Sequence, residues 1–368
     1  MVTADSRRGV VVVFPVLDFG GIESRAVIQA ACWPTDDALR FCCFADAGSA
    51  AATVRGLGFI VDELGTAPSV RNPRALWRLW RYLRYHRPAI VHAVSGAMTV
   101  HGLLAATLAG VPVRIVEEVG IPTRGRVGRV IFPWLYRLAT CVIGVSDAVV
   151  DSLVVHEGVP RMKARRIYNA IEQRYVKAST RTDHPTFTIL AAGRLAPVKG
   201  HADLIRALAP TLLEGDVRMQ IAGDGAERQQ LNDLARQLDV GELIEFLGYR
   251  SDLPDLLAAC DVFVLPSRME GFGLAAVEAM AAGVPVVATR VGGVPEVVPD
   301  WASDFLVAAE DPVAMRTAVE RVRSLSEQER REMGGRLRDH AVQHFGPERY
   351  VRELQDLYAE LLDRADAR

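Results

Sequence analysis

The chain has 368 residues, of which 50% are hydrophobic and 24% are charged, enough for two or three domains with buried cores. These proportions exclude disordered and fibrous proteins, and no apolar run approaches the roughly 20 residues that a membrane-spanning helix needs. The net charge of −2 is unevenly divided. Residues 1–180 carry 22 Lys and Arg against 14 Asp and Glu, and residues 181–368 carry 21 against 31. This contrast predicts two bodies with different partners.

The cysteines and the N-terminal segment both indicate a cytoplasmic protein. Five cysteines without a Cys-x-x-Cys pair predict buried free thiols rather than disulfides or a zinc site. The apolar run 10–14 follows Arg7 and Arg8, as in a signal peptide, but Pro15 and Asp18 end it early. A buried first strand is therefore expected here.

The first half alternates short apolar strands with longer helical patterns, which is typical of parallel α/β architecture. The predicted strands are Gly9–Val16, Leu39–Phe44, Phe59–Val61, Ala89–Val94, Val113–Val116 and Cys141–Val145. The predicted helices include Gly21–Cys32, Pro73–Arg87, Gly96–Ala109 and Ser146–His156. The polar stretch Gln173–Pro185 has no hydrophobic periodicity and predicts a linker between two domains.

The second half starts the same alternation again. Its predicted strands are Thr186–Ala192, Val217–Ala222, Leu243–Leu247, Val262–Leu265, Val284–Thr289 and Phe305–Val307. Its predicted helices are His201–Leu213, Ala226–Leu238, Leu274–Ala282, Val313–Leu325, Gln328–His344 and a last helix, Pro347–Leu362, with one apolar face. Two doubly wound domains predict a cleft, with ligands bound by the loops that follow the strands.

The segment AGRLAPVKG, residues 192–200, follows a predicted strand and opens a helix. Arg194 and Lys199 therefore lie on a turn at the carboxyl end of the strand. Arg can grip phosphate oxygens with two hydrogen bonds and Lys acts as a point charge, so the pair can hold a diphosphate. The alternative is two solvated surface cations.

The segment SRMEGFGLAAVEA, residues 267–279, is a second strand-to-helix turn. Amides of a glycine-rich turn and a helix N-terminus form an anion site. The carboxylates of Glu270 and Glu278 can accept hydrogen bonds from sugar hydroxyls, so the segment suits a nucleotide sugar. Alternatively, Glu270 caps the helix and Glu278 lies on a solvated face.

Three shorter patterns carry less weight. Gly20 and Gly21 follow the first strand, where glycines let the backbone approach a ligand closely. Gly223-Asp224-Gly225 lacks the third glycine of a dinucleotide fingerprint, which argues against NAD binding. No Asp-x-Asp occurs in the chain, so no metal is expected to bridge a diphosphate.

Taken together, the motifs AGRLAPVKG, IAGDGAE, EGFGLAAVEAMAAGVPVVAT and VGGVPEVV resemble the nucleotide-sugar half of a family 4 retaining glycosyltransferase, with Glu270 and Glu278 separated by seven residues. The resemblance is strong after Phe187 and looser before it. It implies the GT-B fold, with two Rossmann-like domains facing a cleft. The expected parts are an acceptor-binding domain at 1–178, a donor-binding domain at 179–345 and a helix at 346–368 that crosses back to the first domain.

The resemblance also implies roles for individual residues. Arg194 and Lys199 would bind the donor diphosphate, helped by the amides of Gly271, Phe272, Gly273 and Leu274. Glu270 would contact the transferred sugar, and Glu278 the ribose. The base would lie against Tyr249, Arg250 and Leu253, and Gly20 and Gly21 against the phosphates.

The acceptor side departs from the family pattern. The family often has a His in the loop after the strand that corresponds to Val113–Val116, where this chain has Glu117 and Glu118. Either Glu118 or His92 takes the sugar-facing role, or the role is absent; Glu118 is preferred. Glu117 and Asn169 complete the predicted acceptor-side set.

The helix predicted over Pro73–Arg87 combines arginines on one face with leucines on another and four aromatic residues. This composition indicates a surface for an anionic membrane or a lipid-phosphate acceptor. The alternative is an ordinary outer helix. Nothing that resembles a nucleic-acid-binding module accompanies it.

The sequence thus predicts a metal-independent, retaining glycosyltransferase that transfers a sugar from a nucleotide-diphosphate donor to an acceptor hydroxyl. The preferred acceptor is a lipid-linked glycan intermediate at the cytoplasmic membrane face. Alternatives are a soluble natural-product acceptor, a non-catalytic nucleotide-sugar or lipid-binding protein, a sugar-nucleotide epimerase and a sugar phosphorylase.

Overall fold

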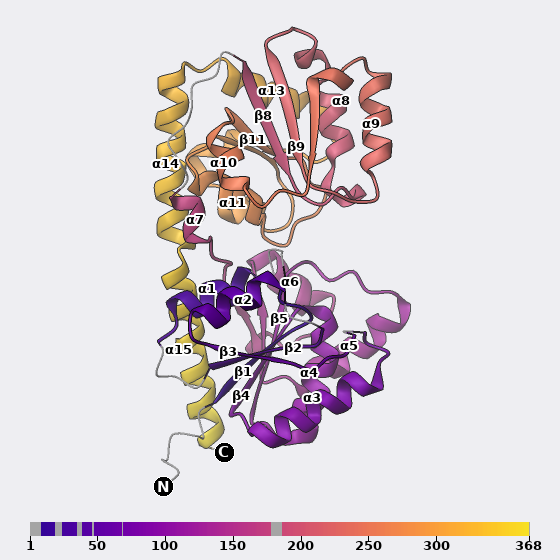
Figure 1. Ribbon diagram of the computed structural model, residues 1–368, viewed down its shortest axis with the longest axis vertical. Helices are drawn as coiled ribbons and strands as arrows, with labels where there is room; N and C mark the ends of the chain where they lie inside the picture. Colours follow the sequence, from indigo (N-terminus) through magenta and orange to yellow (C-terminus); the bar gives the residue numbers. More distant parts are fainter. Residues whose placement is uncertain are drawn as a thin grey trace. The chain divides into compact units, whose positions relative to one another are not determined.

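The computed structural model describes residues 9–18, 24–34, 39–45, 48–67, 69–177 and 186–367. The chain divides into two compact units, one formed by Met1–Ala170 with Pro347–Arg368 and the other by Ile171–Gly346 (Figure 1). The divisions fall at 170/171 and 346/347, whereas the sequence predicted 178/179 and 345/346. Among the described residues, every helix is too short or too polar to cross a lipid bilayer.

The first unit is built on a parallel sheet, seven-stranded over the described residues, in the order β3-β2-β1-β4-β5-β6-β7. The order reverses between β1 and β4, as in a doubly wound fold. Most of these strands are buried along their length, which explains their continuous apolar sequences. The strands are β1 Val10–Phe14, β2 Leu39–Cys43, β3 Ile60–Glu63, β4 Ile90–Val94, β5 Val113–Glu118, β6 Cys141–Gly144 and β7 Ala164–Arg166.

Apart from α6, which packs against β6 and β7, the described helices of this unit form two groups. One group consists of α1, which packs against both α2 and α15; in the other, α4 packs against α3 and α5. Their bounds are α1 Ser24–Cys32, α2 Ser49–Gly56, α3 Pro73–His86, α4 Gly96–Ala109, α5 Arg126–Leu138, α6 Asp147–Val155 and α15 Pro347–Asp366, with a 3-10 turn at Arg161–Lys163. The start of α3 follows from local chemistry, because Asn72 accepts a hydrogen bond from the Arg74 amide and Pro73 occupies the first position.

The last helix, α15, belongs to the first unit although it is the C-terminal element. Its apolar face joins the same buried cluster as β1, β2 and β4. The predicted return of this helix to the first domain is therefore confirmed. The residues that it buries are Tyr350, Val351, Leu354, Leu357, Tyr358 and Leu361.

The second unit has a parallel sheet that is six-stranded over the described residues, in the order β10-β9-β8-β11-β12-β13. Its strands are β8 Phe187–Ala192, β9 Val217–Ala222, β10 Ile244–Gly248, β11 Val262–Leu265, β12 Val286–Thr289 and β13 Leu306–Val307. Its helices are α7 Gln173–Val176, α8 His201–Leu212, α9 Arg228–Gln237, α10 Leu253–Ala258, α11 Leu274–Ala281, α12 Val294–Val297, α13 Pro312–Arg323 and α14 Glu327–Phe345. Two doubly wound parallel-sheet units confirm the predicted fold class.

Two predicted segments differ from the structure. Gln173–Val176, predicted as linker, forms α7 and belongs to the second unit, where Tyr175 is buried; residues 178–185 lie outside the described residues. The strand predicted to end at Val116 continues to Glu118, because Glu117 and Glu118 pair with Ile143 and Gly144 of β6. The two carboxylates are therefore strand residues rather than loop residues.

Candidate functional site

In the second unit, the loops after β8 and β11 meet at one edge of the sheet. The two strands are parallel neighbours, so their carboxyl ends lie side by side. The backbone amide of Arg268, in the second loop, donates to the carbonyl of Val198 in the first at 2.8 Å. The sequence motifs around Lys199 and Glu270 are thus joined through the backbone.

The central contact at this edge is an ion pair between Lys199 and Glu270. Lys199 Nζ lies 2.6 Å from Glu270 Oε1, which also accepts a 2.7 Å hydrogen bond from Ser267 Oγ. Thr289 in turn donates its hydroxyl to the carbonyl of Ser267. The exposed fractions of the Lys199 and Glu270 side chains are 25% and 11%, so both are held in place yet reachable by a ligand.

Gly200 allows the two loops to approach this closely. Its φ is +68°, and a Cβ atom built on it would lie 2.0 Å from the carbonyl oxygen of Pro266. A side chain at this position would push the Lys199 turn away from the loop that carries Glu270.

We therefore expect Gly200→Ala to lower the free energy of unfolding by about 1–3 kcal/mol, because it combines a clash with an unfavourable φ. Chemical denaturation measures the loss. The control is Gly215→Ala, since Gly215 also has a positive φ of +104° but no atom within 4 Å of the new Cβ. Equal destabilisation by the two substitutions would show that the loop contact is unimportant.

The remaining predicted phosphate-binding groups lie on the same two loops. Arg194 is exposed on the turn after β8 and forms no ion pair with any described residue. Gly273, with φ +89°, precedes α11, and Leu274 begins that helix. Phe272 turns its ring into the core, where it packs edge-on against Phe345 with centroids 5.5 Å apart. The Phe272 side chain therefore points away from a ligand, and Gly271 has no side chain. The groups of these two residues that could bind a ligand are their backbone amides, which are the groups named in the prediction.

Glu278 lies on α11 in contact with α7. Tyr175 donates a hydrogen bond to it, and Glu172 and Arg174 lie close enough to affect its titration. Burial, reinforced by the negative charge of Glu172, raises the pKa of Glu278 to about 8, although Arg174 and Tyr175 act in the opposite direction. The carboxyl group is therefore largely protonated at neutral pH, which a solvated surface glutamate would not be.

The segment predicted to hold a base follows β10 at the same edge of the sheet. Tyr249 is 61% exposed, and Arg250 pairs with Asp252 at 2.7 Å on an exposed turn. Leu253 begins α10 and is half-buried. Arg174 donates to the carbonyl of Ser251 at 3.1 Å, which connects this turn to α7. The predicted donor-side residues of the described part thus all lie on loops at one edge of the sheet, at the first residue of α10 or on α11.

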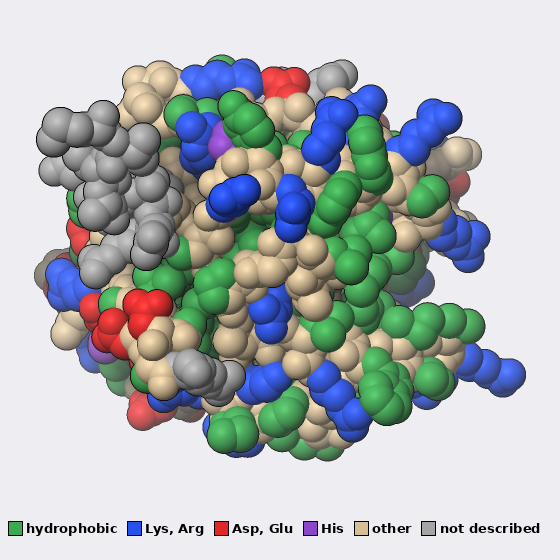
Figure 2. Space-filling view, turned by 90° about the horizontal axis from the view of Figure 1, so that it is seen from below, with side chains coloured by type: hydrophobic (Ala, Val, Ile, Leu, Met, Phe, Trp, Pro, Cys, Tyr) green, Lys and Arg blue, Asp and Glu red, His purple; other side chains and the backbone are tan. Residues whose placement is uncertain are grey.

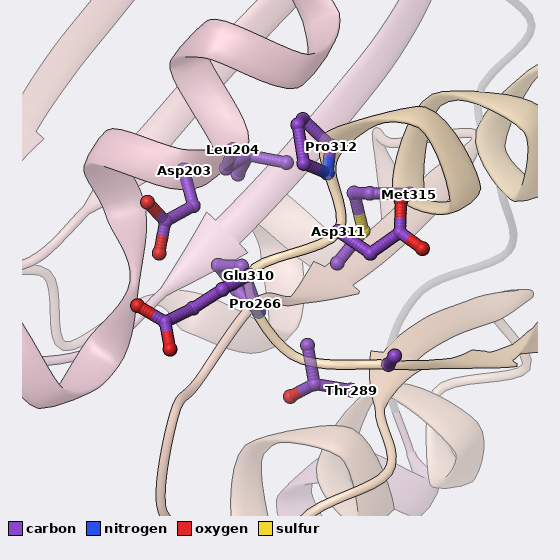
Figure 3. A pocket seen from close by; sticks show the side chains of 9 residues that line it. Asp203, Leu204, Pro266, Thr289, Glu310, Asp311, Pro312 and Met315 are labelled. Carbon is purple, nitrogen blue, oxygen red and sulfur yellow. The ribbon is translucent and has the colours of Figure 1, made fainter.

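A small cavity of about 10 Å³ lies beside these loops (Figure 3). Its volume corresponds to about one water molecule, too little for a substrate. Asp203 and Glu310 lie at its rim, and the guanidinium of Arg268 pairs with both, at 2.8 Å and 3.2 Å. Because Arg268 lies two residues before Glu270, these pairs help to fix the loop.

In the first unit, His92 and Glu117 lie within a buried polar network. Glu117 is 2.6 Å from Arg25 Nη1 and 3.3 Å from His92 Nε2, and His92 Nδ1 lies 2.6 Å from the Tyr358 hydroxyl of α15. Burial alone would raise the pKa of Glu117, but Arg25 and His92 outweigh it and lower the pKa. Arg25 also donates to Asn169. Because His92 and Glu117 are fully buried, contact with an acceptor would require this network to open.

Glu118 points to the opposite face of the sheet, as the next residue on a strand must. Its Oε1 accepts hydrogen bonds from Tyr136 at 2.8 Å, Thr99 at 3.1 Å and Arg124 at 3.1 Å. Burial raises its pKa, although Arg124, Tyr136 and Thr99 counteract part of the rise. Thus Glu117 and Glu118, grouped together in the sequence prediction, belong to two separate networks.

Two further points concern the predicted site. Gly20 and Gly21 lie outside the described residues. Among the residues that the structure does describe, no group of three or more His, Cys, Asp or Glu side chains is arranged to hold a metal ion.

Sequence reasoning missed Glu172, Arg174 and Tyr175, which lie around Glu278. Arg174 and Tyr175 fall in the segment predicted as linker, and Glu172 directly precedes it. Ser267 and Arg268 belong to the motif at 267–279, but the sequence predicted no role for either. The one local signal that could have identified α7 is Tyr175, an aromatic residue within an otherwise polar stretch.

Two family models match the chain in adjoining segments. Residues 19–174 match the model described as Glycosyltransferase Family 4, and residues 173–339 match the model described as Glycosyl transferases group 1. The two matches meet close to the division between the units at 170/171.

Similar proteins with curated names are also glycosyltransferases. The chain is 31% identical over 230 residues to N-acetyl-alpha-D-glucosaminyl L-malate synthase of Bacillus anthracis, covering 59% of this chain and 60% of the relative. It is 36% identical over 188 residues to D-inositol 3-phosphate glycosyltransferase of Corynebacterium kroppenstedtii, covering 48% and 41%. It is 26% identical over 317 residues to UDP-Gal:alpha-D-GlcNAc-diphosphoundecaprenol alpha-1,3-galactosyltransferase of Escherichia coli, covering 80% and 81%. The first two matches thus span about half the length of those relatives.

Solved structures share the fold over nearly the whole chain. Anabaena HepE in complex with UDP and glucose superposes with a TM-score of 0.82 at 22% identity, covering 96% of this chain and 100% of that one. A glycosyltransferase from Rickettsia africae gives 0.81 at 18%, covering 97% and 99%. These structural similarities show that the chain has the GT-B fold. The two family models show that it belongs to glycosyltransferase family 4.

Proposed function

We propose that the protein is a retaining glycosyltransferase that moves a sugar from a nucleotide-diphosphate donor to an acceptor hydroxyl. The observation that carries this proposal is the 2.6 Å contact of Lys199 with Glu270 at the joined loops after β8 and β11. A cation, a carboxylate and the amides that open α11 lie together there, as an anionic sugar donor requires.

The main chemical task is to stabilise the leaving diphosphate. As the bond from the anomeric carbon to the phosphate oxygen breaks, negative charge grows on that oxygen. Lys199 and Arg194 oppose this charge together with the amides of residues 271–274, and such preorganised groups are typically worth about 3–4 kcal/mol each. Because these groups supply the charge, we expect the reaction to proceed without a metal and to survive chelators.

The carboxylates bind the rest of the donor. Once the diphosphate neutralises Lys199, Glu270 can accept a hydrogen bond from the transferred sugar. Glu278 accepts the ribose hydroxyls, and the turn from Tyr249 to Leu253 holds the base. The contact of Gly20 and Gly21 with the phosphates, which the family resemblance implies, stays a prediction.

Retention follows in this proposal from attack on the face that the leaving group occupies. The acceptor oxygen forms its bond to the anomeric carbon as the phosphate oxygen departs. The acceptor proton passes to that phosphate oxygen. No protein nucleophile takes part.

For the acceptor we prefer a lipid-linked glycan intermediate, bound by the first unit at the cytoplasmic face of a membrane. The relative from Escherichia coli is named for a diphosphoundecaprenol-linked substrate. In the first unit, α3 exposes Trp77 and Tyr85 together with Arg74, Arg81 and Arg84, which suits an anionic lipid surface. Glu118 remains the preferred sugar-facing residue; because it is buried, it would have to leave its hydrogen bonds with Tyr136, Thr99 and Arg124 to contact a sugar.

A soluble acceptor is the second candidate, because the relative from Bacillus anthracis is named for L-malate. Transfer assays with a lipid-linked glycan and with small hydroxy acids separate the two candidates. A protein that binds the donor without turnover in any such assay would be a non-catalytic binding protein.

The donor proposal is tested by thermal denaturation with UDP-, GDP-, ADP- and dTDP-sugars in the absence of metal. A ligand that binds only the folded state raises the melting temperature. We expect one nucleotide class to raise it by several degrees, about 4 °C at a hundredfold excess over Kd for a chain of this size. The absence of any shift with all four classes would contradict a donor site at Lys199 and Glu270.

A further inference from the structure

Helix α5 presents an apolar side to solvent. Val127, Val130, Ile131 and Trp134 are 71%, 66%, 48% and 64% exposed. Their spacing of i, i+3, i+4 and i+7 places them on one side of the helix, the spacing that normally faces a core. We call these four residues the α5 apolar face.

The opposite side of α5 packs against the rest of the unit. Leu135 and Tyr136 are buried, and the ring of half-buried Phe132 lies 5.9 Å from that of Tyr136 and 3.6 Å below the guanidinium of Arg124. The α5 apolar face is therefore additional to the packing that holds the helix on its unit. A surface of this kind marks an interaction site.

The charged residues of this helix are all positive. Arg126, Arg129 and Arg137 are exposed on the same helix, and the guanidinium of Arg137 lies 4.2 Å from the Trp134 ring centroid. No Asp or Glu occurs between Glu118 and Asp147 in the sequence. An apolar side bordered by arginines and containing a tryptophan is the composition of a helix that lies in a membrane interface.

From this arrangement we infer that α5 binds to an anionic membrane, with the α5 apolar face inserted among the lipid headgroups and its arginines on the lipid phosphates. The thirteen residues of α5 form a helix about 20 Å long. A helix of this length can lie in the membrane interface but is too short to span the bilayer. The inference extends the proposed function, since it gives an enzyme with a lipid-linked acceptor a means to reach it.

Charge favours a membrane over a second copy of the chain. A symmetric dimer through α5 would bring the arginines of two helices together without an acidic partner on either, which costs energy. An anionic lipid surface instead attracts each arginine. Figure 2, which views the molecule from below, shows Lys and Arg side chains interspersed with hydrophobic ones over much of that face, with few acidic side chains among them.

The test is co-sedimentation of the full chain with vesicles of phosphatidylglycerol and phosphatidylcholine, and with vesicles of phosphatidylcholine alone. We expect binding to the anionic vesicles that weakens with salt. The double variant Ile131→Ser/Trp134→Ser should bind them at least about tenfold more weakly. The matched control is Trp301→Ser/Val313→Ser, which also removes an exposed tryptophan and an exposed aliphatic residue, 41% and 65% exposed, from the second unit.

Two readouts separate this inference from the donor proposal. The Ile131→Ser/Trp134→Ser variant should keep the wild-type melting temperature and its shift with nucleotide sugars, since α5 carries none of the donor-side residues. If the Ile131→Ser/Trp134→Ser variant bound anionic vesicles as tightly as the wild type, the inference would be overturned. So would a wild-type protein that ignores anionic vesicles but forms a dimer that the same variant abolishes.

Discussion

Lys199→Met is expected to lower kcat/KM for sugar transfer by about 10²–10³-fold, or about 3–4 kcal/mol in transition-state free energy. The substitution keeps an unbranched side chain of similar length and removes the charge that lies 2.6 Å from Glu270. The leaving diphosphate then loses one of its two proposed cations, and among the described residues Glu270 keeps the hydrogen bond from Ser267. Steady-state release of nucleoside diphosphate measures the effect.

The matched control for this substitution is Lys177→Met. Lys177 is exposed and follows α7, so its loss should leave kcat/KM unchanged. The melting temperature of Lys199→Met should stay close to that of wild type, because the lysine is partly exposed and its charge contributes little to folding. Wild-type turnover by Lys199→Met would remove the proposed role of this residue.

Glu278→Gln is expected to change both stability and donor binding, with opposite signs above pH 8. Burial raises the pKa of Glu278 to about 8 in the folded protein, from an ordinary value of 4.5. Between pH 4.5 and about pH 8, the carboxyl group therefore keeps its proton in the folded state and has lost it in the unfolded state. The free energy of unfolding of the wild type should fall as pH rises through this window, by about 2–5 kcal/mol for this group. Glutamine cannot ionise, so the variant should be more stable than wild type above pH 8.

Donor binding should show the complementary pH dependence. Ribose hydroxyls favour the ionised carboxylate as acceptor, so nucleotide binding should release a proton from Glu278. Nucleotide affinity of the wild type should then rise by up to about tenfold per pH unit towards pH 8. Glu278→Gln should bind about a hundredfold more weakly at pH 8, because it loses a charged hydrogen-bond acceptor.

Calorimetric titration of the nucleoside diphosphate at several pH values measures this dependence, with Glu242→Gln on an exposed turn as the control. The titration of the nucleotide itself is common to all three proteins and cancels between them. If Glu278→Gln shows the wild-type pH slope, the proton is released elsewhere and the ribose assignment fails.

The sequence predicted the two sheets and the strand-to-helix turns that carry Lys199 and Glu270 because the relevant signals are local. Valine-rich runs such as Val10–Phe14 read directly as strands buried on both faces. The turn from Ser267 to Leu274 combines a strand end, glycines and a helix start within a few residues. Lys199 and Glu270 could each be identified from such a turn, and the adjacency of β8 and β11 brings them together.

Elements with weak local signals were missed. Helix α5 has Pro133 in its interior and Gly128 in its first turn, both unfavourable for a helix, and its outward apolar side carries no information about the core. Helix α7 has four residues, too few for any periodicity. Its contact with Glu278 joins residues about a hundred positions apart, which only the tertiary fold can supply.

The acceptor side depended on strand pairing that the sequence did not reveal. Glu117 and Glu118 were expected in a loop, but pairing with β6 extends β5 through both. Consecutive strand residues face opposite sides of the sheet, so Glu117 meets Arg25 and His92 whereas Glu118 meets Thr99, Arg124 and Tyr136. The different surroundings of Glu117 and Glu118 follow from the pairing of β5 with β6, which a local sequence pattern does not show.

The central claim, that the second unit binds a nucleotide-diphosphate sugar at the joined loops, is tested most directly by a crystal structure of the protein with the nucleotide identified by thermal denaturation. We predict diphosphate oxygens within about 3 Å of Lys199 Nζ and of the Arg194 guanidinium, and a ribose hydroxyl at the same distance from a Glu278 carboxylate oxygen. A nucleotide bound elsewhere, with Lys199 still paired only to Glu270, would contradict the claim.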